Sequence, residues 1–68
     1  MSYYKKIMQL YETIEFRIKR AGEINYDVLI YELTKSFPVP EKKIHDRIKL
    51  LEKLNKLEII DGVIFWKT

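Results

Sequence analysis

Basic side chains concentrate in one segment of this chain of 68 residues. Residues 35–56 carry seven Lys or Arg against three Asp or Glu, a net charge of +4, whereas residues 1–34 carry five of each sign. The formal net charge of the whole chain is +3. A basic segment inside a balanced chain is typical of a surface that binds a polyanion, although lysines also populate the solvated face of ordinary amphipathic helices.

Other kinds of site chemistry find little support in the sequence. There is no Cys, one His, and a set of ten carboxylates that lacks any recognisable metal-ligand spacing. His45 and Asp46 are neighbours in sequence and point in different directions on a helix, while Ser2 and Ser36 have no base nearby. We therefore expect no enzymatic activity, no cofactor, no metal and no small-molecule substrate.

Two helices are predicted in the first half of the chain. From Tyr4 to Ala21 the apolar residues recur in alternating steps of three and four, which predicts a helix over about residues 3–21 that ends at Gly22. Residues 23–25 are too short for an independent strand, although Ile24 can add one edge pairing. Asn25 is a good N-cap for a second helix over about 26–36. The residues that this second helix is predicted to bury are Leu29, Ile30, Leu33 and Phe37.

A third helix and a hairpin are predicted after the break at residues 37–39. Pro40 suits the first position of a helix over about 40–54, and Asn55 suits the left-handed conformation that ends one. Asp61-Gly62 lies between two β-rich runs, which predicts a type I′ hairpin. In that register Ile59 faces Ile64 and Leu57 faces Trp66.

The segment 39–59 resembles the recognition-helix-to-wing segment of small archaeal and bacterial winged-helix regulators. In that family an apolar trio spaced by four and three precedes a Gly and a Leu-x-Ile strand, and here Asn55 stands where the Gly usually is. The trio here is Ile44, Ile48 and Leu51. The resemblance implies an α+β, mainly α, winged helix-turn-helix of three helices plus a short C-terminal β-hairpin wing, forming one domain over residues 1–68.

The resemblance also implies a ligand, double-stranded DNA, and a role as a transcriptional regulator that reads the major groove with the third helix. The chain departs from the family at the wing tip, where acidic Asp61 replaces the usual basic residue, so we expect no minor-groove contact there. Arg47 replaces a small or apolar residue and points to the buried side, where we expect a structural or ion-pair role, with a phosphate contact as the alternative. The predicted DNA-binding residues are Lys42, Lys43, His45, Asp46, Lys49, Lys53, Lys35 and Lys56.

An alternative function is a protein-interaction adaptor in a replication, transcription or division complex. It is suggested by the short, acidic wing together with the apolar face of the hairpin. The sequence also has more apolar side chains than one small core needs, which favours a symmetric homodimer through the first helix, the hairpin or both, with packing inside a monomer as the alternative. The predicted dimer or partner residues are Tyr3, Tyr4, Met8, Leu50, Leu54, Ile60, Val63 and Phe65. Short apolar runs and the absence of a signal-peptide pattern lead us to expect a cytoplasmic protein with no membrane partner, and the composition leans towards a thermophilic source.

Overall fold

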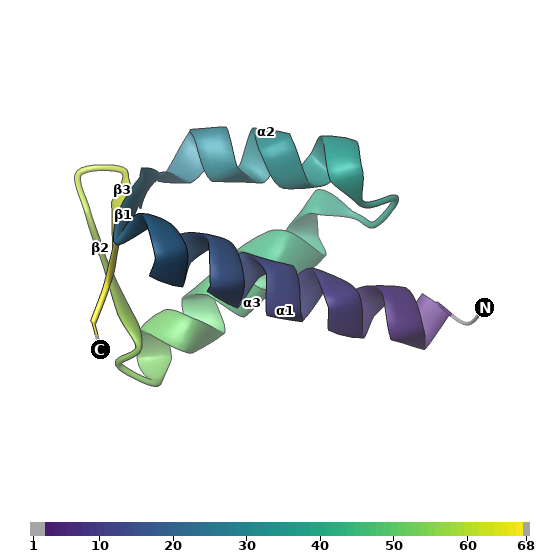
Figure 1. Ribbon diagram of the computed structural model, residues 1–68, viewed down its shortest axis with the longest axis horizontal. Coiled ribbons are helices and arrows are strands. Elements are labelled where there is room, and N and C mark those ends of the chain that lie inside the picture. The colour runs from purple at the N-terminus through teal and green to yellow at the C-terminus, as the bar shows by residue number, and fades with distance from the viewer. Residues whose placement is uncertain (1–2, 68) are drawn as a thin grey trace.

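The computed structural model describes residues 3–67, with Tyr3 described by its backbone alone. It is mainly helical, with three helices and a three-stranded antiparallel sheet at one end of the helices (Figure 1). The elements are α1 (Tyr3–Ala21), β1 (Glu23–Asn25), α2 (Tyr26–Ser36), α3 (Glu41–Lys53), β2 (Leu57–Ile60) and β3 (Val63–Trp66).

The sheet has the strand order β1-β3-β2, and its hairpin has the predicted register. Ile59 pairs with Ile64 and Leu57 pairs with Trp66. Asp61 and Gly62 have φ values of 49° and 76°, so both central residues of the turn adopt the positive φ that a type I′ turn needs. Residues 23–25 do more than the single predicted edge contact, because all three pair with β3.

The helix boundaries agree with the sequence to within one residue, with one correction at α3. Pro40 is the N-cap and not the first helical residue, since its φ of −60° and ψ of 139° are extended. Proline fixes only φ, and that value fits both positions, so the sequence could not separate them. At the other end α3 stops at Lys53, and Asn55 has the expected positive φ, 61°.

The core lies between the three helices and the inner face of the sheet. Phe37 was predicted to be buried; it packs against this core but is only partly buried. No helix described between residues 3 and 67 is both long and apolar enough to cross a membrane. The fully buried large side chains are Leu10, Ile14, Ile18, Leu29, Ile44, Ile48, Leu51, Leu57 and Ile64.

Candidate nucleic-acid interface

The outer face of α3 carries the lysines that the sequence singled out. Ile44 and Ile48 are fully buried, and Lys42, Lys49 and Lys53 project from the opposite side of the helix, where all three are exposed. The side chains of Lys42 and Lys49 are 81% and 63% accessible. In Figure 1 α1 crosses in front of α3.

Carboxylates on the same helix partly offset this positive charge. Lys42 Nζ lies 2.9 Å from Asp46 Oδ2, and Lys49 Nζ lies 4.0 Å from Glu52 Oε1. Exposed pairs of this kind contribute between about 0 and 1 kcal/mol, so a phosphate group can displace the carboxylate at little cost. Among the residues described, Lys43 and Lys53 form no ion pair. The face therefore keeps a positive bias without being uniformly basic.

His45 lies at the edge of this face and is engaged by Tyr26, the first residue of α2. The two rings stack with their centroids 5.4 Å apart, and Tyr26 Oη lies 2.9 Å from His45 Nδ1. On the other side of the imidazole, Nε2 is 3.4 Å from Glu41 Oε1. His45 thus connects the two helices, and a base contact by it would compete with these bonds.

Burial raises the pKa of the Tyr26 phenol above its ordinary value of 10.0, and nearby carboxylates add to the effect, Glu52 most strongly. The phenol therefore stays neutral and can keep donating or accepting its hydrogen bond with His45 at physiological pH. Sequence reasoning identified Tyr26 only as the start of a helix. No local signal could reveal the contact, because 19 residues separate the two side chains.

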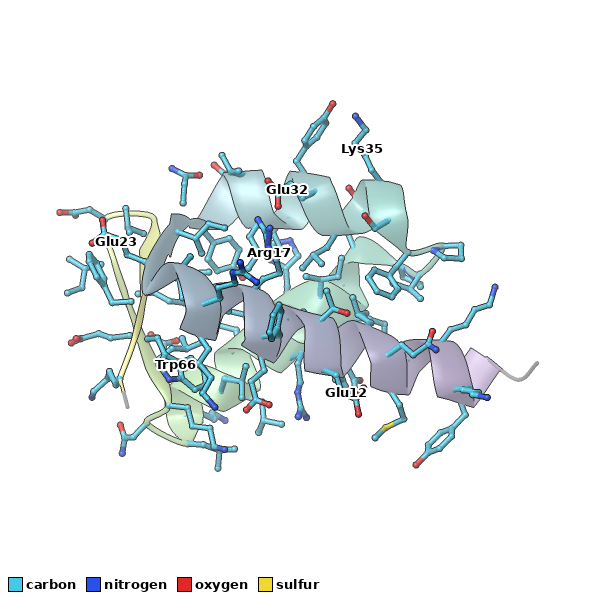
Figure 2. The ribbon with its side chains drawn as sticks, viewed as in Figure 1. Glu12, Arg17, Glu23, Glu32, Lys35 and Trp66 are labelled. Carbon is cyan, nitrogen blue, oxygen red and sulfur yellow. The ribbon has the colours of Figure 1, made fainter. Side chains whose placement is uncertain are left out.

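Lys35 and Lys56 do not extend the cluster on α3. Lys35 lies in the last turn of α2 with its Nζ 3.2 Å from Tyr31 Oη, and Figure 2 shows it pointing away from the rest of the molecule. Lys56 turns towards α1, where its Nζ lies 3.6 Å from Glu15 Oε2. The structure thus brings together Lys42, Asp46, Lys49 and Lys53, with Lys43 and His45 beside them.

The turn of the hairpin is held against the start of α2. The Tyr26 N–H donates to the Gly62 carbonyl over 2.8 Å, which ties the Asp61-Gly62 turn to the helix. An acidic turn fixed in this way is poorly suited to enter a DNA groove.

Arg47 is partly buried on the side of α3 that faces α1, in agreement with the predicted orientation towards the buried side. Its Cζ lies 4.5 Å from the centre of the Tyr11 ring, and its Nε is buried without a hydrogen-bond partner among the described atoms. A cation–π contact of this kind contributes roughly 0.5–2 kcal/mol. The Arg47 guanidinium thus contacts an aromatic ring, which fits the structural role expected for this residue.

The predicted partner residues fall into two groups. Tyr4 and Met8 of α1 and Leu50 and Leu54 of α3 are exposed on the helices. Arg47 meets Tyr11 and Lys56 meets Glu15, so Leu50 and Leu54 lie towards the C-terminal half of α1, away from Tyr4 and Met8. The second group, Ile60, Val63 and Phe65, lies on the outer face of the sheet. The side chain of Tyr3 lies outside the described part of the chain.

A hollow of about 390 Å³ lies between α1 and the hairpin. Aromatic and oppositely charged side chains mix along it, so its chemistry favours no single class of ligand. The residues that line the hollow are Glu12, Glu15, Phe16, Lys19, Lys56 and Trp66.

Between residues 3 and 67 no three potential metal-ligating side chains gather at one point.

No protein-family model matches the chain, and comparison with curated proteins and with solved structures found no significant match.

Proposed function

We propose that this chain is a winged helix-turn-helix domain that binds double-stranded DNA through the outer face of α3. The order of its elements supports the fold: a long helix, a short strand, two helices joined by a tight turn at residues 37–40, and a hairpin whose second strand pairs with the short strand. In this interpretation α2 and α3 form the helix-turn-helix and β2–β3 form the wing.

The observation that carries the proposal is the uncovered, lysine-bearing face of α3. With 13 residues the helix is about 20 Å long, and its exposed side could enter a major groove, which admits one α-helix. Lys42 in the first turn would contact a phosphate or a guanine edge, and Lys49 would follow two turns later on the same side. Lys53 at the end of the helix would contact the backbone.

Asp46 gives this face a selective character. A carboxylate among lysines weakens attraction to any phosphate backbone, and it can accept a hydrogen bond from a cytosine amino group in the major groove. Its pairing with Lys42 over 2.9 Å would keep both side chains extended on the groove side before DNA arrives. We therefore propose sequence-preferring binding, in keeping with a transcriptional regulator.

Fluorescence anisotropy with a labelled DNA duplex tests the proposal. The logarithm of the affinity should fall linearly with the logarithm of salt concentration, with a slope between about −2 and −4 for two to four lysine–phosphate contacts. A single-stranded oligonucleotide of the same length serves as the comparison, and it should bind more weakly. An absence of duplex affinity at low salt would refute the proposal.

A further inference from the structure

The outer face of the sheet is an apolar surface that no other element covers. The strand register sets Phe65 of the central strand β3 between Glu23 of β1 and Glu58 of β2. In the next row of the same face, Val63 lies between Asn25 and Ile60. Figure 1 shows all three helices on the other side of the sheet.

Three apolar side chains on this face take no part in the core. Ile60 is 49% exposed, and Val63 and Phe65 are partly exposed. The partly buried side chains that pack against the core include Ile59 and Trp66 of the same two strands, but none of these three. Because side chains alternate along a strand, this division separates the inner face of the sheet from the outer one.

Carboxylates frame the apolar residues. Glu23 and Glu58 are exposed on either side of Phe65, and two strand spacings put their backbones about 10 Å apart. Asp61 adds a third exposed carboxylate at the turn. Within residues 3–67 none of the three forms an ion pair. Lys67 follows the end of β3, and strand alternation places this basic residue on the same side of the sheet as Phe65, two residues away.

We propose that the outer sheet face, defined by Ile60, Val63 and Phe65 with Glu23, Glu58 and Asp61 around them, binds an amphipathic helix of a partner protein that carries Lys or Arg along both borders of its apolar stripe. A helix has a diameter of about 10–12 Å, which matches the separation of the two flanking glutamates. The apolar stripe would rest on Phe65 and Val63, and the basic borders would pair with the carboxylates.

Charge also argues against a second copy as the occupant. A symmetric dimer through this face would bring two sets of carboxylates together, and like charges placed opposite each other are destabilising. A basic partner instead gains from the same groups. The inference does not depend on DNA binding, because α3 contributes no residue to this face.

The test uses two synthetic helical peptides of about 15 residues with the same leucine stripe, one bordered by Lys and the other by Glu. Both are titrated into the ¹⁵N-labelled protein, and amide shifts are followed by NMR. The Lys-bordered peptide should shift amides of residues 23–25, 57–60 and 63–66 in a saturable manner. The Glu-bordered peptide should bind at least tenfold more weakly.

Two double variants identify the contacts. Glu23→Gln with Glu58→Gln should weaken the Lys-bordered peptide about fivefold, as expected for two exposed ion pairs. Glu12→Gln with Glu32→Gln makes the same change in charge on the helices and should leave its affinity unchanged (Figure 2). All four residues are exposed, and the ion pair of Glu32 with Arg17 that the control variant removes is also exposed, so both variants should fold.

Three results would overturn the proposal. The first is equal binding of the two peptides, and the second is a set of shifts centred on α3. The third is a concentration-dependent shift of the sheet amides in the protein alone, which would identify a second copy as the occupant. DNA binding is measured separately by anisotropy, so failure of one proposal leaves the other intact.

Discussion

Removing Lys42 and Lys49 together should weaken duplex binding at least tenfold. The double alanine variant lowers the formal net charge from +3 to +1 and takes both charges from the outer face of α3. If each lysine contacts one phosphate, the salt slope should become less steep by about 1.8. Tenfold corresponds to about 1.4 kcal/mol, or about 0.7 kcal/mol for each lysine, a modest demand on a charged hydrogen bond.

The loss of Lys42 has a second effect, on Asp46. That carboxylate loses its partner at 2.9 Å and would then face the phosphates without compensation. Adding Asp46→Ala to the double variant removes this unpaired carboxylate and should therefore recover part of the affinity. A purely structural role for the Lys42–Asp46 pair would give no such recovery, because Asp46 is exposed and contributes little to folding.

The matched control is Lys6→Ala with Lys67→Ala, which makes the same change in net charge on α1 and just after β3. Anisotropy is measured for both variants across one salt series, and circular dichroism verifies the fold. The control should lose less than about threefold, because neither lysine belongs to α3 and salt screens charges that do not contact the phosphates. Equal losses in the two variants, or an unchanged salt slope, would refute α3 as the reading helix.

Three further predictions concern stability and are measured by urea unfolding. Ile64→Ala removes a fully buried residue of the central strand and should cost about 2–5 kcal/mol; a cost near zero would contradict the core described here. Gly62→Ala should cost about 1–2 kcal/mol from its φ of 76° alone, since an added Cβ meets no atom within 4 Å, and an unchanged midpoint would refute that turn geometry. The pKa of Tyr26 is raised in the folded protein, so as pH rises the unfolded chain loses the phenolic proton first and stability should fall above about pH 10. Tyr26→Phe should make this fall shallower. Equal pH slopes for the two proteins would count against the raised pKa.

Local signals in the sequence account for most of the fold. The helix limits followed from Gly22, Asn25 and Asn55, whose conformational preferences act within one turn of the chain. The hairpin register followed from Asp61-Gly62, because a two-residue turn fixes every pair beyond it. These are short-range constraints, so a single sequence was sufficient to predict them.

Contacts between distant elements could not be predicted in this way. The stacking of Tyr26 on His45 and the ion pair of Lys56 with Glu15 depend on how helices cross, which no local pattern encodes. The ion pair of Lys56 with α1 likewise could not be predicted, whereas the contact of Lys35 with Tyr31 lies within α2. The lysines of α3 itself were easier, because helical periodicity alone separates them from the buried side.

The distribution of charge links the two proposed surfaces. The sheet face carries Glu23, Glu58 and Asp61, whereas α3 carries most of the lysines outside α1. A phosphate backbone would repel the first surface and attract the second, so the approach of DNA would be biased towards α3 even before contact. The same bias would leave the sheet face turned away from the duplex. A basic helix bound to the sheet face would meet no competition from DNA. It would also neutralise the carboxylates of that face and so relieve their repulsion of the phosphates. Binding of the partner should therefore strengthen DNA binding, and by reciprocity DNA should strengthen binding of the partner.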